Sequence, residues 1–155
     1  MKRLIALVTG HLLLVTAASA AMPITGYYKT IDDASGNARS IVRLYECDAY
    51  ICGQIVALFS DDGAYITDTI ANPVRRASRV SGNPYVAGLR IINGMSWDSG
   101  RNEFRGGTIM DPANGRNFQS RMWMDGDVLR VRGQIGPVGR TQTWHPLDEL
   151  PSGAR

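Results

Sequence analysis

The two cysteines, Cys47 and Cys52, are the residues whose type and spacing point most directly to chemistry. Strand-like runs flank the pair on both sides. A close, even pair of cysteines in an exported chain is typical of a disulfide across a hairpin. A redox motif instead uses C-x-x-C at the start of a helix. We therefore expect a structural disulfide between these cysteines, with free thiols, or metal or redox chemistry, as the alternatives.

Catalytic side chains are scarce in the rest of the chain. The sequence has two histidines, His11 near the N-terminus and His145 directly before a proline. It contains no G-x-S-x-G nucleophile elbow. The aspartates Asp61, Asp62 and Asp68 do not follow the D-x-D-x-D-G spacing of a calcium loop. We therefore predict no enzyme activity, no cofactor and no metal site.

A local excess of positive charge occurs at Arg75, Arg76 and Arg79. It forms either a solvated loop face or a contact for an anion or a lipid headgroup. The whole chain carries a formal net charge of only +3, and arginine alternates with aspartate along most of its length. Because nucleic-acid binding requires clustered positive charge, we do not expect a nucleic-acid partner.

Residues 1–20 have the pattern of a cleaved secretory signal peptide. A basic start at Lys2 and Arg3 precedes the apolar run 4–15, and small residues up to Ala20 supply a cleavage site. The run is shorter than the roughly 20 residues that a membrane-spanning helix needs. We expect residues 21–155 to form one domain, periplasmic or secreted, without a membrane span.

Period-two alternation of apolar and polar residues dominates this predicted domain. The 17 glycines and 7 prolines supply more turn residues than a helical bundle tolerates. Consecutive antiparallel strands that leave no free edge form an up-and-down barrel. We therefore predict an all-β, eight-stranded up-and-down antiparallel barrel, with an open sandwich as the alternative. The expected strands are 24–30, 39–47, 51–59, 88–96, 102–110, 116–124, 127–135 and 139–145.

One connection between these strands is long. Residues 60–87 exceed the usual limit of about 12–15 residues for a loop without structure of its own. We expect this segment to be a long lid loop or a packed functional loop, with a helical turn near 72–76.

The clearest hairpin is centred on the dipeptide Asp125-Gly126, which suits a type I′ turn. A two-residue turn there places Met122 opposite Leu129, on an apolar face that packs in the core. The other face places Arg121 opposite Arg130, where like charges repel unless water or an anion lies between them.

Seven sequence blocks, in order along nearly the whole predicted domain, resemble the domain-of-unknown-function 2147 family. The resemblance implies a small exported bacterial protein with a lipocalin-like barrel and no established activity. Tyr28 stands where the family usually has the Trp of a G-x-W motif. The blocks are ITGYY (24–28), CGQIV (52–56), NP (72–73), GLRIINGM (88–95), GGTIMDPANGR (106–116), LRVRGQIG (129–136) and QTW (142–144).

Two functions fit a lipocalin-like barrel of this size. The first is binding of one small apolar or amphipathic molecule, with aromatic side chains giving contact area and an arginine fixing an acidic group. The second is an envelope protein-interaction or inhibitor module, with a packed barrel and functional rim loops. The candidate ligand-binding residues are Tyr28, Tyr45, Tyr85, Arg90, Trp97, Trp123, Arg132 and Trp144.

Overall fold

The computed structural model describes residues 24–155, so the predicted signal peptide lies outside the described residues. Each of the eight predicted segments is a strand, with its ends shifted by no more than two residues. One further short strand, β4, lies in the long connection. The strands are β1 (Gly26–Ile31), β2 (Ala38–Cys47), β3 (Tyr50–Phe59), β4 (Ile66–Thr69), β5 (Arg90–Asp98), β6 (Glu103–Asp111), β7 (Arg116–Asp125), β8 (Val128–Ile135) and β9 (Val138–Leu147).

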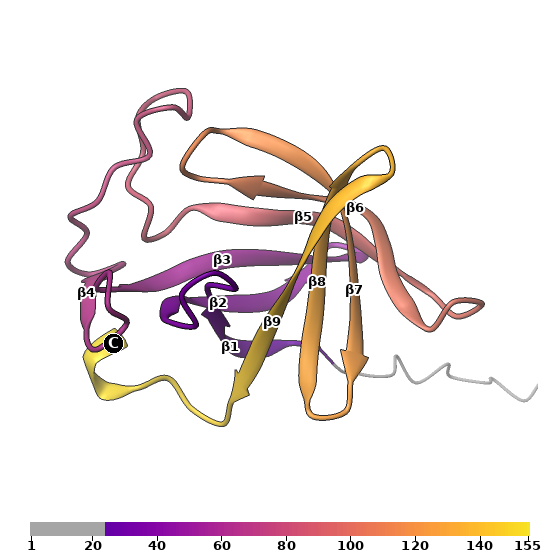
Figure 1. The fold of residues 1–155 in the computed structure, drawn as a ribbon, viewed down its shortest axis with the longest axis horizontal. Helices are drawn as coiled ribbons and strands as arrows, with labels where there is room; N and C mark the ends of the chain where they lie inside the picture. Colours follow the sequence, from indigo (N-terminus) through magenta and orange to yellow (C-terminus); the bar gives the residue numbers. More distant parts are fainter. Residues whose placement is uncertain (1–23) are drawn as a thin grey trace, which may run out of the picture.

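The strands close into an eight-stranded antiparallel barrel (Figure 1), which confirms the predicted fold. Within the barrel, each strand pairs with the next barrel strand in sequence. The short strand β4 pairs only with the C-terminal end of β3, so the barrel neighbour of β3 is β5. The ring is completed by β1, which pairs with β2 on one side and with β9 on the other. In the second pairing Thr30 lies opposite Trp144 and Tyr28 lies opposite Pro146.

The main core fills much of the barrel interior with side chains that alternate along the strands. Ile51, Ile92, Met95, Phe104 and Met122 are each at most 1% exposed. They pack in one cluster to which every barrel strand contributes. This pattern is the expected result of period-two alternation, because successive side chains of a strand point to opposite faces of the sheet.

A smaller apolar cluster lies on the outside of the barrel, over β2 and β3. Ile41, Val56 and Ala57 are buried there together with Ala154 of the C-terminal segment. The short 3₁₀ helix Ser152–Ala154 contacts β4, and Figure 1 shows the C-terminus beside that strand. No helix within residues 24–155 is long and apolar enough to cross a membrane.

The turn of the β7–β8 hairpin lies one residue later in the chain than predicted. The turn residues are Gly126 and Asp127, and only Gly126 has a positive φ, of 61°, as in a type II′ turn. Met122 therefore pairs with Val131 rather than with Leu129. Because the register moves by two residues, each side chain keeps its predicted face, and Met122 is buried in the core.

The segment 60–87, which we call the lid, is packed onto the barrel. Ala77 and Val86 are buried in the main core cluster. An antiparallel bridge between Arg76 and Tyr85 joins the two arms of the lid. The N–H of Ala77 donates to the Pro84 carbonyl, and that of Val86 donates to the Arg75 carbonyl. The lid is thus held by backbone pairing and by two small apolar side chains.

The helical turn predicted near 72–76 is wrong, because a buried carboxylate holds this segment in another conformation. Asp68 is 3% exposed and accepts hydrogen bonds from the backbone N–H groups of Val74 and Arg75 and from the Thr67 hydroxyl. Burial raises the pKa of the Asp68 carboxyl, but the hydrogen bonds from Arg75, Thr67 and Val74 outweigh it and hold the pKa below its usual value.

We predict that Asp68→Ala lowers the free energy of unfolding by about 2 kcal/mol at pH 7, because three hydrogen bonds to a buried charge are lost. Urea unfolding measures the change. The matched control is Asp61→Ala, an exposed aspartate of the same loop, which should change stability by less than about 0.5 kcal/mol.

The same pair of proteins gives a pH test. The folded-state pKa of Asp68 is lowered, so its stabilisation is complete above the unfolded pKa, about 4, and disappears as the pH falls through the folded value. The stability difference between wild type and Asp68→Ala should therefore shrink below about pH 4. An equal difference at pH 7 and at pH 2 would contradict this role.

Candidate functional site

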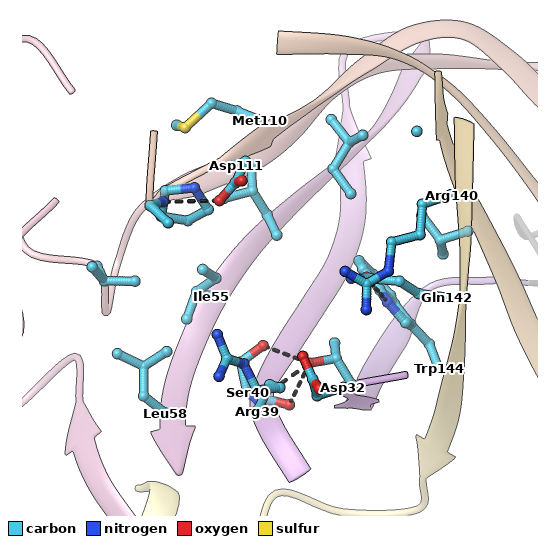
Figure 2. A pocket seen from close by; sticks show the side chains of 18 of the residues that line it. Asp32, Arg39, Ser40, Ile55, Leu58, Met110, Asp111, Arg140, Gln142 and Trp144 are labelled. Carbon is cyan, nitrogen blue, oxygen red and sulfur yellow. Dashed lines mark hydrogen bonds between the residues drawn. The ribbon is translucent and has the colours of Figure 1, made fainter. Parts of the chain in front are cut away.

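A cavity of about 470 Å³ opens at one end of the barrel. At this end β1, β3, β6 and β8 finish, while β2, β5, β7 and β9 begin. The lid supplies part of the wall through Arg75, Arg76 and Val86. Figure 2 shows side chains from β2, β3, β6 and β9 around the open space.

The floor of the cavity is apolar. Ile55, Leu58, Val131 and Trp144 line it, and each is at most 5% exposed. The indole N–H of Trp144 donates to Oε1 of Gln142, 3.1 Å away, so the polar atom of this large side chain is satisfied within the wall. The floor therefore offers contact area to an apolar group without an unpaired indole N–H.

Tyr28 closes the barrel beneath the floor. Its ring lies 6.5 Å from that of Trp144, and its hydroxyl donates to the Ile24 carbonyl at 3.1 Å. Burial raises the pKa of the Tyr28 hydroxyl. Tyr28 thus fills the closed end as an aromatic plug whose polar atom bonds the chain just before β1.

The mouth of the cavity is charged. Arg39, Arg75, Arg76 and Arg140 line it together with Asp32 and Asp111. Both aspartates are occupied by their own turns. Asp32 accepts hydrogen bonds from the backbone and hydroxyl of Ser35 and from the Ala34 N–H, and these lower its pKa despite some desolvation. Asp111 accepts from the Ala113 N–H at 2.9 Å and from the Asn114 amide at 2.7 Å.

Two of the four arginines differ in how they are held. The Arg39 guanidinium makes no side-chain hydrogen bond and no ion pair within the described part of the chain, and its charge helps to lower the pKa of Asp32. Arg75 lies 4.0 Å from the Asp68 carboxylate, and its Nη2 donates to the Phe59 carbonyl at 3.3 Å and to the Thr67 hydroxyl at 3.4 Å. The donors of Arg39 therefore remain available at the mouth.

The other two arginines are held in place by neighbours. Arg76 lies with its guanidinium 3.7 Å from the centre of the Tyr85 ring and donates to the Asn83 carbonyl. Arg140 pairs with Asp33 at 2.9 Å, and Figure 2 shows its guanidinium directed toward the open space. Four guanidinium groups thus lie at the mouth, with the self-bonded carboxylates of Asp32 and Asp111 in the lining and those of Asp33 and Asp68 beside Arg140 and Arg75.

Of the eight residues predicted to bind ligand, Trp144 lines the cavity. Tyr28 lies directly below it, and Tyr85 stacks on the lining residue Arg76. The other five lie outside the lining, namely Tyr45, Arg90, Trp97, Trp123 and Arg132.

Each of these five has its own place in the barrel. Trp97 packs its exposed ring 4.9 Å from Phe104, and Trp123 lies beside Arg121 on the outer face. Tyr45 lies beside Arg43, Arg90 is exposed at the start of β5, and Arg132 bonds Gln134 and Thr141.

Sequence reasoning missed Arg39, Arg140 and Gln142 as cavity residues. The alternation of residues in the sequence could have identified two of them. Arg140, Gln142 and Trp144 alternate along β9, so a prediction that places Trp144 on the inner face also places the other two there. Of the arginine cluster noted in the sequence, Arg75 and Arg76 line the mouth, whereas the exposed Arg79 does not.

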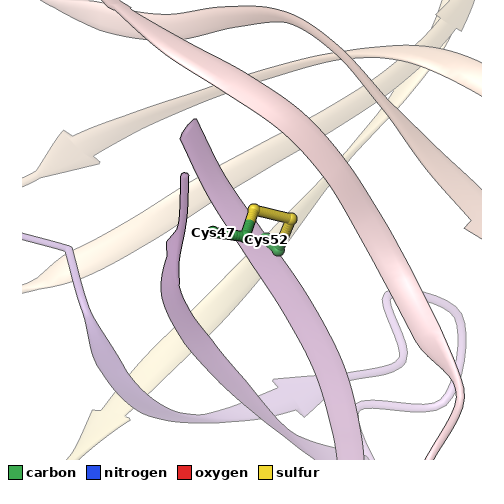
Figure 3. The surroundings of a disulfide bond; sticks show 2 residues. All are labelled: Cys47 and Cys52. Atoms are coloured by element: carbon green, nitrogen blue, oxygen red, sulfur yellow. A yellow bond between two sulfur atoms is a disulfide. The ribbon is translucent and has the colours of Figure 1, made fainter. Parts of the chain in front are cut away.

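The predicted disulfide between Cys47 and Cys52 is confirmed (Figure 3). It spans the tight turn between β2 and β3, with a Cα–Cα distance of 5.8 Å. This turn lies at the closed end, opposite the cavity mouth. No group of three or more His, Cys, Asp or Glu side chains within 24–155 is arranged to hold a metal ion.

Comparison with known proteins supports the same architecture. A family model described as "Uncharacterized protein conserved in bacteria (DUF2147)" matches residues 26–146. The solved structure described as "Protein HP1028 from the human pathogen Helicobacter pylori belongs to the lipocalin family" superimposes with a TM-score of 0.60. The two chains are 16% identical, and the match covers 81% of this chain and 83% of that one. No curated protein matches the chain.

We predict that the disulfide stabilises the closed end without shaping the cavity. Replacing both cysteines (Cys47→Ser with Cys52→Ser) should lower the free energy of unfolding by about 2 kcal/mol, the value expected for so short a loop. The near-ultraviolet circular dichroism of the tryptophans should stay unchanged. Wild type in reducing buffer is the control and should match the double variant. A collapse of the tryptophan signal in both would show that the bridge organises the cavity as well.

Proposed function

We propose that this chain, which belongs to the DUF2147 family, binds one small amphipathic molecule with an acidic group in the open end of its lipocalin-like barrel. The observation that carries the proposal is the polarity of the cavity. Its floor is apolar, and its mouth carries four arginines. A volume of about 470 Å³ falls within the usual range for small-molecule sites, roughly 300–1,000 Å³.

The ligand would lie with its apolar part against Trp144, Ile55 and Val131. These side chains are at most 3% exposed, so the wall is already formed before binding. Binding to a preformed wall costs little ordering of the protein. Gln142, whose Oε1 accepts from Trp144, keeps its amide N–H groups for a polar atom of the ligand.

The acidic group would lie among the mouth arginines. Arg39 is the best candidate for direct contact, because its guanidinium makes no hydrogen bond or ion pair in the described chain and the nearby Asp32, whose pKa it helps to lower, is bonded to its own turn. Arg76 is held by the Tyr85 ring and the Asn83 carbonyl, so its remaining donors are preorganised. Charge-assisted hydrogen bonds to a carboxylate or phosphate are stronger than neutral ones, which would give the site a preference for anions.

Binding rather than catalysis is the activity we propose. His145 is exposed on β9 and is not among the cavity residues, and no serine or cysteine of the wall lies beside a base. Ser40, the serine of the lining, is bonded to Thr30. The disulfide supports an oxidising compartment, in agreement with the export that the N-terminal sequence predicts.

A second function, a protein-interaction or inhibitor module, is favoured by apolar side chains at the rim. Val74 of the lid is 70% exposed, and Ile135 and Val138 beside the β8–β9 turn are 51% and 76% exposed. Apolar side chains gathered on an exposed surface mark protein contact sites, so in this second function the rim would contact an envelope protein. The ligand test below separates the two functions.

Calorimetric titration with dodecanoate tests the proposed function, with dodecanol as the uncharged probe. We expect saturable dodecanoate binding by wild type, weakened about tenfold in Arg39→Gln, which corresponds to about 1.4 kcal/mol. Dodecanol should bind both proteins equally. The matched control is Arg43→Gln, an exposed arginine further along β2 and outside the cavity, and it should bind dodecanoate like wild type.

A cavity-filling variant completes the test. Ile109 lines the cavity and is only partly buried, so Ile109→Trp has room to project into it and should reduce the affinity for both probes. Saturable binding that is unchanged in Ile109→Trp would place the ligand elsewhere. Absence of heat with every probe, together with a stoichiometric envelope protein recovered by crosslinking, would favour the interaction module.

A further inference from the structure

A second, smaller cavity of about 200 Å³ lies in the barrel wall between β6 and β7. The pairing of these strands is interrupted here, since Arg105 pairs with Arg121 and the next pair is Thr108 with Gln119. Two residues of β6, Gly106 and Gly107, therefore lie opposite a single residue of β7, Ser120. Gly106 has a φ of +83°, which other residues rarely adopt, so this glycine permits the bulge that opens the cavity.

The lining of this wall cavity is polar throughout. It consists of the bulge glycines, two arginines, Ser120 and the amides of Gln119 and Gln134. Three buried side-chain atoms near the cavity make no hydrogen bond within the described chain: the Ser120 hydroxyl, Nε of Arg121 and Oε1 of Glu103, which lies 3.6 Å from Nε of Arg105. Ser120 alternates with Arg121 along a regular strand and pairs with Gly133, so its hydroxyl faces the barrel interior, whereas Arg121 lies on the outer face. Buried polar groups are normally paired, so Nε of Arg121 points to an acceptor on the outer face that the chain does not supply.

The available groups are mostly donors. An arginine Nε–H can only donate, and Arg132 already donates to Oε1 of Gln134, which leaves the Gln134 amide N–H groups for another acceptor. No carboxylate is among the residues that line the cavity. A volume of 200 Å³ exceeds the roughly 30 Å³ that one water molecule occupies, so a polyatomic group fits.

Positive charge accumulates around the wall cavity. Arg105, Arg121 and Arg132 occupy directly paired positions on three neighbouring strands, so their side chains form one row on the outer face. Directly opposed like charges repel. Glu103 compensates part of this charge, at 3.6 Å from Arg105 and 3.5 Å from Arg121, and Asp98 lies 3.7 Å from Arg105. Asp98 is shared with Arg101, so the group keeps an excess of arginine.

We infer that the wall cavity between β6 and β7 binds a tetrahedral oxyanion, phosphate or a phosphate monoester. Arg121 and Arg105 supply the charge, the unpartnered Arg121 Nε–H supplies a buried donor, and Gln134 supplies an amide N–H. The bound anion lies between the opposed arginines and lowers their repulsion. This site is separate from the cavity at the barrel mouth, since the two share no residue.

The test is a titration of ¹⁵N-labelled protein with inorganic phosphate, followed by two-dimensional NMR at constant ionic strength, with sodium chloride as the reference salt. We expect saturable shifts of the Arg121 Nε–H signal and of the Gly107 and Ser120 amides. Arg121→Gln should weaken binding about tenfold or more, whereas Ser120→Ala, whose side chain faces the barrel interior, should bind phosphate like wild type. The matched control Arg130→Gln removes an arginine of the same hairpin that pairs with Asp125 instead, and should bind phosphate like wild type.

The source of the phosphate group is resolved by a parallel titration with methyl phosphate. Tighter binding of methyl phosphate than of phosphate identifies an esterified ligand, and the reverse order identifies the free ion. Arg105→Gln replaces Arg121→Gln if the latter fails to fold. Shifts that do not saturate, that sodium chloride reproduces, or that persist unchanged in Arg121→Gln would overturn the inference and show a cavity filled by water alone.

Discussion

Pairing between β1 and β9 is the constraint on which the rest of the structure depends. It joins the two ends of a strand meander, and every barrel strand then has a partner on both sides. A closed ring of eight strands has an interior just wide enough to be filled by side chains or to hold one small ligand. This barrel does both along its axis. Tyr28 and the core residues fill the closed end, and the open end keeps a cavity.

The lid contributes to this difference between the filled end and the open end of the barrel. Because Ala77 and Val86 are small, the lid packs against the core without filling the mouth. Asp68 fixes the course of the chain from the base of the lid and leaves Arg75 and Arg76 at the cavity. The arginines at the mouth therefore depend on a buried carboxylate that contacts the lid backbone and is not itself among the cavity residues.

The eight barrel strands could be predicted because alternation and turn residues are local properties of the sequence. The same alternation determines which side chains of a strand are buried. The buried face of the β7–β8 hairpin was therefore predicted correctly, although its register was not. The disulfide followed from the short spacing of two cysteines. These features need no knowledge of distant contacts.

The site could be predicted only in part, because it depends on which strand ends meet. Trp144 was identified, but its neighbours across the cavity come from β2, the lid and β6. Large aromatic residues such as Trp97 and Trp123 were chosen by type, whereas Trp97 packs on Phe104 near the closed end of the barrel and Trp123 lies on the outer face. The bulge at Gly106 and the course of 72–76 were missed because non-local pairing and a buried carboxylate decide them.

The cavity opens at only one of the two barrel ends, and this has a practical consequence. The β2–β3 and β7–β8 turns both lie at the end away from the cavity, and the latter is formed by exposed residues. A dye, an affinity handle or a surface linker attached at Asp127 would leave the mouth unobstructed. Such an immobilised barrel would present its arginine-lined opening to solution, a suitable geometry for a sensor.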